Sequence, residues 1–322
     1  MKKIGILLLF ATISGGLASE GDGGYAGAFL RMGMGARAKA MGDAFTAVPE
    51  DAIAAFYNPA LLPHLKTRQA LVSFAFLPLD RKLDYIGYAQ ALQPRVAEED
   101  SARPLRAGFS VAWVHAGVDQ IDGRDMSGNH IGYFSNSEHA FYLSFALSPA
   151  QFLSVGISGK VLYNRFPKIA QEDKAITSRG FGMDIGAFVT PYANLMIGVT
   201  LKDNLSKYTW NTDKLWDRGT STTYQFPRVL RSGVAYRIPQ EWLLVAFDVE
   251  QSKLQNPRYH FGMEFFYPNI GAIRLGIDHD RPTMGVGFFA HVFGKSVKIS
   301  YGFVDQKEAP GSDHIFSWSF DL

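Results

Sequence analysis

The stretch GFGMDIGAFVT, residues 180–190, shows the period that decides the fold. Apolar side chains occupy alternate positions, and small or polar residues lie between them: Phe181, Met183, Ile185, Ala187 and Val189 against Gly182, Asp184 and Gly186. A period of two is typical of a β-strand whose two faces meet different surroundings. It recurs in NLMIGVTLKDN (194–204), RYHFGMEFFY (258–267) and SVKISYGFV (296–304), so we predict an all-β protein.

Fourteen runs of this kind can be marked along the chain. Most have about 9 to 12 residues, which is the length that a tilted strand needs to cross a bilayer. The predicted strands are 69–78, 83–92, 105–115, 138–148, 152–164, 180–190, 194–203, 226–238, 242–251, 257–267, 271–279, 283–293, 295–305 and 313–321.

The links between these strands alternate in length. One set is short, at 148–151, 190–193, 238–241, 267–270 and 294–295, and the other is often long, at 116–137, 165–179 and 204–225. Short turns at one end and long loops at the other are typical of outer-membrane barrels, with the turns in the periplasm. The link at 93–104 is an exception, since it is long on the expected short side.

A secreted soluble sandwich or barrel is the alternative, because its strands also alternate. A soluble barrel carries charge on its outer face, whereas this chain has 19% charged residues, 14% aromatic residues and long aromatic runs on one face. Its last strand, HIFSWSFDL (314–322), resembles the signal read by the outer-membrane assembly machinery, although such signals usually end in Phe rather than in Leu322. We therefore predict a 14-stranded antiparallel transmembrane β-barrel, residues 69–322, in the outer membrane of a Gram-negative-type bacterium. Its partners would be the membrane lipid and that machinery.

The N-terminus reads as a secretory signal peptide, residues 1–18. Lys2 and Lys3 precede an apolar run from Ile4 to Ile13, and small residues follow. The run is shorter than the roughly 18 residues of a spanning helix, although an uncleaved anchor is the alternative. Without the two lysines the formal charge of +2 falls to about zero, which gives no reason to expect a nucleic-acid partner. The chain has no cysteine, so disulfides and thiolate sites are excluded.

Residues 19–68 have a different sequence pattern from the predicted strands. In FLRMGMGARAKAMGDAF (29–45), Gly33, Gly35 and Ala38 fit the spacing of a dinucleotide-binding loop, but no strand–helix–strand alternation follows, so we reject that interpretation. A short helix is expected after Pro49 and should end before Pro59. A barrel of this size has a lumen, so we predict that residues 19–68 form a hatch or plug whose glycines allow close backbone packing.

The stretch from Phe29 to Leu62 resembles the N-terminal signature of the PorV/PorQ-like outer-membrane proteins, part of the wider FadL-type superfamily of fourteen-stranded barrels with an N-terminal hatch. The matching positions are Gly33, Gly35, Ala36, Met41, Gly42, Ala44, Phe45, Asp51, Ala52, Asn58, Pro59 and Ala60. Asn58, Pro59 and Ala60 resemble the hatch motif of the superfamily. Residues 226–238, 274–278 and 299–320 resemble the late strands of the family, so the likeness covers nearly the whole mature chain. It departs at Asp43, where glycine is usual, and at Leu322.

The predicted register points charges of both signs into the lumen. They are Lys160, Asp184, Lys202, Arg231, Arg237, Asp248, Glu250, Glu264, Arg274, Asp278, Lys298 and Asp321. They would form either a selective polar path or paired charges that hold the hatch, and we favour the pairs because an unpaired buried charge is costly. The eight histidines lack metal-binding spacing and no nucleophile elbow occurs, so we predict no metal site, no cofactor and no enzyme.

The predicted loop 204–226 carries aromatic and apolar residues that could bind a partner: Tyr208, Trp210, Leu215, Trp216 and Tyr224. They could instead fold back as a lid or anchor at the lipid interface. The PorV/PorQ resemblance implies that the barrel binds or shuttles secreted cargo proteins in a type IX-like secretion system. The wider superfamily implies passive transport of hydrophobic small molecules. Transport predicts an apolar pocket continuous from the loops into the lumen, whereas docking predicts a blocked lumen and a broad apolar loop surface.

Overall fold

The computed structural model describes residues 25–92, 106–166, 175–213, 219–292, 294–306 and 311–322. The predicted signal peptide and the link at 93–104 lie outside these residues. The strands are β1 Gln69–Leu77, β2 Arg81–Leu92, β3 Arg106–Arg124, β4 His130–Ala150, β5 Leu153–Phe166, β6 Ile176–Tyr192, β7 Leu195–Asn204, β8 Lys207–Asn211, β9 Ser221–Gln225, β10 Val229–Arg237, β11 Leu243–Ser252, β12 Gln255–Tyr267, β13 Gly271–Asp278, β14 Arg281–Val292, β15 Lys295–Asp305 and β16 Ser312–Asp321.

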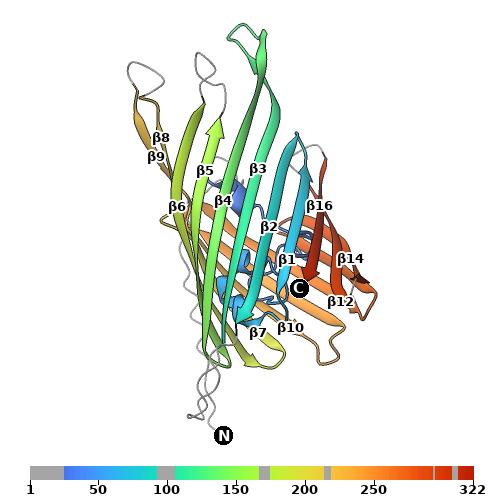
Figure 1. Ribbon diagram of the computed structural model, residues 1–322. Helices are drawn as coiled ribbons and strands as arrows, with labels where there is room; N and C mark the ends of the chain where they lie inside the picture. The colour runs from blue at the N-terminus through green and yellow to red at the C-terminus, as the bar shows by residue number, and fades with distance from the viewer. Residues whose placement is uncertain (1–24, 93–105, 167–174, 214–218, 293, 307–310) are drawn as a thin grey trace.

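The described strands form one antiparallel sheet that closes on itself (Figure 1). β1 pairs with β16, and each strand pairs with its neighbour except where β7 pairs with β10. β8 and β9 are a hairpin that pairs with the upper part of β6, and the other fourteen strands make the barrel. The prediction of a fourteen-stranded antiparallel barrel is confirmed.

Two predicted loops contain more strand than expected. The link at 116–137 is mostly a hairpin, in which β3 and β4 pair as far as Arg124 and His130. The loop at 204–225 contains β8 and β9. At the β3–β4 tip water reaches both faces of the ribbon, and β8 and β9 have five residues each, so neither place shows the long apolar alternation of a lipid-facing strand.

The barrel is taller on one side than on the other (Figure 1). We call β3–β6, with 19, 21, 14 and 17 residues, the long wall. We call β10–β14, with 9, 10, 13, 8 and 12 residues, the short wall. The end of the barrel with the β3–β4 hairpin is the loop end, and the opposite end, with the short connections, is the turn end.

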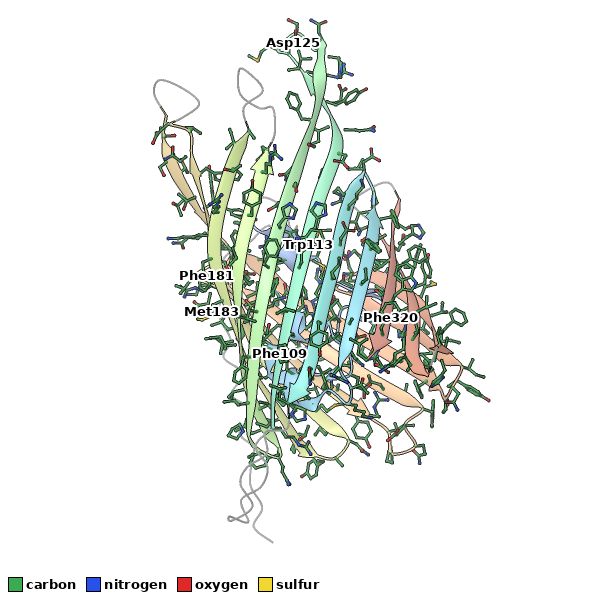
Figure 2. All side chains as sticks on the ribbon, in the orientation of Figure 1. Phe109, Trp113, Asp125, Phe181, Met183 and Phe320 are labelled. Carbon is green, nitrogen blue, oxygen red and sulfur yellow. The ribbon has the colours of Figure 1, made fainter. Side chains whose placement is uncertain are left out.

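The outer face of the barrel is apolar. Phe141, Leu143 and Phe145 alternate along β4 with the buried residues Tyr142 and Ser144, and their side chains are largely exposed. Figure 2 shows this face of the long wall, with Phe109, Trp113, Phe181 and Met183 labelled. No helix among the described residues is long and apolar enough to cross a membrane. The exposed apolar side chains of the strands form the surface that lipid would cover.

The described residues 25–68, which we call the inner segment, lie inside the barrel. They form η1 Ala28–Arg31, α1 Ala36–Ala40, α2 Ala54–Tyr57 and η2 Pro59–His64. α1 packs against β13–β16, and η2 packs against β2–β6. The expected short helix is α2, which ends before Pro59, but the chain continues at once as the 3-10 helix η2. Nearly all of the inner segment is buried.

Candidate functional site

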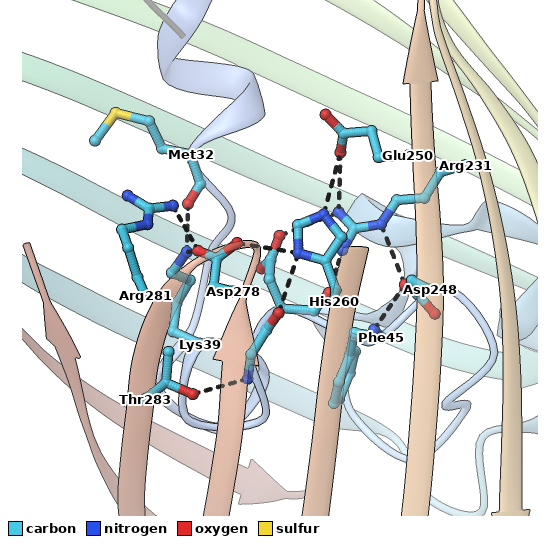
Figure 3. Close-up of polar contacts among 12 residues, drawn as sticks. Met32, Lys39, Phe45, Arg231, Asp248, Glu250, His260, Asp278, Arg281 and Thr283 are labelled. Carbon is cyan, nitrogen blue, oxygen red and sulfur yellow. Dashed lines mark hydrogen bonds and ion pairs between the residues drawn. The ribbon is translucent and has the colours of Figure 1, made fainter. Parts of the chain in front are cut away.

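Arg231 on β10 is the centre of a buried ion-pair cluster on the short wall (Figure 3). Its Nε lies 3.1 Å from Asp248 Oδ2, and its Nη1 lies 3.1 Å from Asp43 Oδ2 and 3.5 Å from Glu250 Oε2. Asp43 belongs to the inner segment, and its carbonyl oxygen also accepts a hydrogen bond from the guanidinium. One cation therefore ties the inner segment to two strands. Asp43, where the resembled family usually has glycine, contributes directly to this contact.

The Asp248 side chain also binds the backbone of the inner segment. Its Oδ2 accepts hydrogen bonds from the amides of Phe45 and Thr46, at 3.0 and 2.9 Å, and from the Thr46 hydroxyl at 2.6 Å. A buried carboxylate that accepts several hydrogen bonds recovers part of its desolvation cost. The turn at residues 45–46 is therefore fixed to β11.

A second group of charges surrounds Asp278 on β13. Its Oδ2 lies 2.8 Å from Lys39 Nζ and 2.6 Å from Arg281 Nη2, and its Oδ1 lies 3.0 Å from His260 Nδ1 (Figure 3). His260 Nδ1 is also 3.1 Å from the carbonyl oxygen of Gly42. Lys39 and Gly42 are inner-segment residues, so this group forms a second attachment to the short wall.

Glu264 and Arg274 form a third attachment near the turn end. Glu264 accepts from Arg274 Nε at 2.8 Å and from Arg37 of the inner segment at 2.5 Å. Arg37 also lies 3.1 Å from Glu50, which in turn pairs with Arg237. The predicted lumen residues Arg231, Glu264 and Arg274 are thus placed among opposite charges.

Of the other predicted lumen charges, Lys298 on β15 pairs with Asp321 on β16 at 3.6 Å, and Lys160, Asp184 and Lys202 lie where β5, β6 and β7 meet. Lys160 Nζ is 2.7 Å from Asp184 Oδ1 and 2.5 Å from Asp203 Oδ1, and all three side chains are buried. Lys202 is also buried, and its Nζ lies 4.1 Å from the ring centroid of Phe56. Its ammonium is stabilised by an aromatic face of the inner segment.

The motif Asn58–Pro59–Ala60 lies against the long wall. Asn58 Nδ2 donates to the carbonyl oxygens of Thr46 and Ala187, each at 3.1 Å, and its Oδ1 accepts from the Ala60 amide at 3.0 Å. A Cβ added at Gly156 would stand 2.6 Å from backbone atoms of Pro59 and Ala60. The contact with the long wall is therefore backbone against backbone.

Gly33, Gly35 and Gly42 are turn residues of the inner segment, with φ of 76°, 81° and 61°. A Cβ at Gly42 would stand 2.3 Å from the carbonyl oxygen of Phe261, which cannot move aside. Gly33 faces Asp43, whose Oδ1 accepts a hydrogen bond of 2.6 Å from the Tyr57 hydroxyl. These glycines fit the segment into the lumen.

The five predicted loop candidates do not share one surface. Tyr208 is 2% exposed, whereas its partner across the hairpin, Tyr224, is 55% exposed. Trp210 is half-buried, and Leu215 and Trp216 lie outside the described residues. Tyr208 and Trp210 therefore fold back toward the barrel, as the lid alternative expects for these two positions, and Tyr224 does not.

An apolar cluster runs without a break from this hairpin into the lumen. The ring centroids of Trp210 and Tyr208 are 6.1 Å apart, and those of Tyr208 and Phe226 are 4.9 Å apart. Phe226 packs against the inner segment at Gly27, and the same cluster continues through Leu30 to Phe56. The voids beside Leu30 and Phe56 have about 10 Å³, so side chains fill this track. Transport predicted an apolar pocket continuous into the lumen, and docking predicted a blocked lumen. The apolar side chains are continuous, as transport predicted, but they leave no open space, as docking predicted.

A cavity of about 400 Å³ lies at the turn end, between the inner segment and the walls. Charges of both signs line it, including Arg37, Glu50, Asp51, Arg237 and Lys298. Burial raises the pKa of the Asp51 carboxyl above its ordinary value, and Asp51 Oδ1 has no hydrogen-bond partner in the described part of the chain. Apolar residues, among them Ile53, Leu71 and Phe266, line the rest of the cavity, so its lining is mixed.

One serine–histidine pair lies on the outer face, where Ser137 Oγ is 2.7 Å from His139 Nε2. Trp113 Nε1 donates to His139 Nδ1 at 3.3 Å, so a neutral His139 carries its proton on Nε2 and donates to the serine. A serine that accepts this proton is not activated as a nucleophile. No group of three or more metal-ligating side chains in the described residues is arranged to hold a metal ion.

No protein-family model matches the sequence, and no curated protein matches it significantly. Solved structures are similar in fold. The toluene transporter TodX of P. putida has a TM-score of 0.57 and 12% identity, over 90% of this chain and 99% of TodX. The deltaS2 mutant of TodX, described as a monoaromatic hydrocarbon channel, gives 0.61 and 11%, over 90% and 99%. A Pseudomonas aeruginosa FadL homologue gives 0.56 and 11%, over 89% and 97%.

The chain therefore has the fold of FadL-type outer-membrane barrels, which confirms the fold that the broader resemblance implies. The narrower likeness to PorV/PorQ proteins stays a prediction.

Sequence reasoning missed the inner-segment half of the ion pairs: Arg37, Lys39 and Asp43. Three charges within seven residues of a Gly- and Ala-rich stretch were the available signal, because such a stretch is otherwise suited to close burial.

Proposed function

We propose that this protein is an outer-membrane channel that lets hydrophobic small molecules enter from outside the cell, and that the inner segment is its hatch. The loop end would face the exterior. The observation that supports this best is the apolar track from Trp210 through Tyr208 and Phe226 to Phe56. The structural neighbours described as hydrocarbon and toluene transporters share the fold, which agrees with this proposal.

In this proposal the described conformation is the closed one. The track is filled by side chains, which leave a void of only about 10 Å³ beside Leu30 and Phe56. Passage therefore requires the inner segment to shift. Ion pairs suit a movable contact better than apolar packing does, since water can replace each partner when they separate.

The track can be tested by comparing Tyr208, which lies in it, with Tyr224, which lies opposite Tyr208 on the hairpin and is exposed. Tyr208→Asp should abolish most uptake of radiolabelled toluene by cells that have no other such channel, because it places a charge in the track. Tyr224→Asp is the matched control, since Tyr224 faces solvent on the same hairpin, and its uptake should equal that of the wild type. Equal uptake by both variants would disprove the track.

The hatch can be tested with a reversible lock. The Ala36 amide donates to Ser317 Oγ at 2.8 Å, and the chain has no cysteine of its own. A disulfide formed in the Ala36→Cys/Ser317→Cys variant should stop uptake, and a reductant should restore it. Unchanged uptake with the disulfide shown to be intact would mean that the hatch need not leave β16.

Docking of secreted proteins is the second candidate, and a specific observation favours it. The tip of the β3–β4 hairpin exposes Met126, Ile131 and Tyr133 above the rest of the barrel. If the barrel serves a type IX-like system, the Met126→Ser/Ile131→Ser/Tyr133→Ser variant should lose cell-surface cargo while toluene uptake is unchanged. Retained cargo would remove this candidate.

A further inference from the structure

The outer face of the long wall changes sharply in polarity between two neighbouring rows of side chains. The lower row is apolar and runs in register across β2–β6 as Ile86, Trp113, Phe141, Val161 and Phe181. The next outward row toward the loop end, which we call the polar row, is Asp84, His115, His139, Tyr163 and Arg179. Trp113 and Phe181 mark the apolar side of this boundary in Figure 2. The boundary is the upper edge of the lipid-facing band.

Positive charge gathers at one end of this boundary. Arg179 ends the polar row, Arg165 lies two positions beyond Tyr163 on β5, and Lys207 opens β8 beside them. All three side chains are exposed, and none forms an ion pair with a carboxylate of the described residues. Asp84, by contrast, is already paired with His115 at 2.9 Å.

The two arginines are diagonal neighbours on one face of the sheet. Arg179 stands opposite Tyr163, and Arg165 stands opposite Thr177. Diagonal neighbours have Cβ atoms about 7 Å apart, a span that two guanidinium groups can close around a single phosphate. Directly below them, Val161 and Phe181 continue the apolar band.

The outer face of the short wall has no comparable cluster of cationic side chains among the described residues. Its outward positions on β10–β14 carry no charged residue in the described part of the chain, and they stay apolar nearly to the loop end. The cluster is therefore a local feature and not a ring around the barrel.

We propose that this cluster binds an anionic phospholipid-like molecule of the outer leaflet, with its phosphate on Arg165 and Arg179 and its acyl chains over Val161, Phe141 and Phe181. A lipid fits both halves of the surface, because the cationic half lies directly on the apolar band. A soluble anion would gain nothing from the apolar half.

The test uses the full-length protein in mixed micelles, with dioleoyl-phosphatidylglycerol as the anionic probe and dioleoyl-phosphatidylcholine as the zwitterionic one, followed by native mass spectrometry. The wild type should retain the anionic lipid preferentially. Arg165→Gln/Arg179→Gln should weaken that retention by about 10- to 30-fold. Arg228→Gln/Lys253→Gln, which removes two exposed charges elsewhere among the described residues near the loop end, is the matched control and should bind as the wild type does.

Two results would overturn the proposal. One is equal retention of both lipids by the wild type, which would mean that lipid binds only through the apolar band. The other is undiminished anionic-lipid retention by the double arginine variant. Both arginines are exposed, so heat-modifiable electrophoresis should show the variant fully folded, and Arg165→Lys/Arg179→Lys should keep most of the binding.

Discussion

The long wall and the short wall hold the same inner segment by different physical means. The long wall meets it through backbone contacts, with Gly156 against Pro59 and Ala60. The short wall also has close backbone contacts, with Gly262 and Gly276 against Met41 and Gly42, and it adds buried ion pairs centred on Arg231 and Asp278. Backbone contacts tolerate no added atom, whereas ion pairs can separate if water replaces each partner. We infer that release of the segment from the short wall would have to break its ion pairs as well as its backbone contacts.

The largest expected effect breaks the short-wall attachment. Arg231→Met leaves Asp43, Asp248 and Glu250 buried without their shared cation. Removing one partner of a buried pair costs about 3–5 kcal/mol, so urea unfolding should move to much lower urea and single-channel recordings should show openings. Arg228→Met is the control, because Arg228 is exposed, and its unfolding should not change measurably. Equal stability of the two variants would contradict the ion-pair attachment.

Overfilling the long wall should have the next largest effect. Gly156→Val adds atoms that would stand 2.6 Å from the backbone of Pro59 and Ala60. We expect a loss of about 1–3 kcal/mol in the free energy of unfolding, measured in the same urea titration. Gly159→Val has a matched change on the same strand, but its nearest neighbours are 3.8 Å away, so it should be tolerated. A tolerated Gly156→Val would show that the segment does not press on this wall.

A smaller effect, of opposite sign, is expected at the cavity between the walls. The pKa of Asp51 is raised in the folded protein above its ordinary value of 3.8, so its ionised form costs stability at neutral pH. Asp51→Asn should raise the thermal midpoint at pH 7 by a few degrees, and this advantage should shrink as the pH falls through the raised pKa. A midpoint difference that does not depend on pH would rule out this origin.

The smallest effect is expected at the tip of the long wall. Met126 and Tyr133 are exposed, and the barrel does not rest on them. Met126→Ser and Tyr133→Ser should each change the free energy of unfolding by less than about 0.5 kcal/mol. A larger loss would mean that the hairpin supports the barrel and is not only an exposed extension of it.

The strands of the barrel could be predicted because lipid and lumen impose opposite polarity on alternate residues, as in Gly180–Thr190. The same rule could not find β8 and β9, which have five residues each, or the upper part of β3 and β4, where water meets both faces. It placed Arg231, Glu264 and Arg274 toward the lumen. It could not pair Arg231 with Asp43 or Glu264 with Arg37. Alternation along a strand predicts whether a side chain points into the lumen, but it does not predict which residue that side chain contacts there.

The bond between the Ala36 amide and Ser317 joins positions 281 residues apart. The inner segment is synthesised first, yet every strand that neutralises its charges is synthesised much later. During assembly Lys39 and Asp43 must therefore stay hydrated until β10–β13 have formed, since no earlier strand offers them an ion-pair partner in the described structure. The inner segment thus precedes the barrel in the chain but is fixed only with it, and closure of β16 onto β1 completes both the wall and its contents.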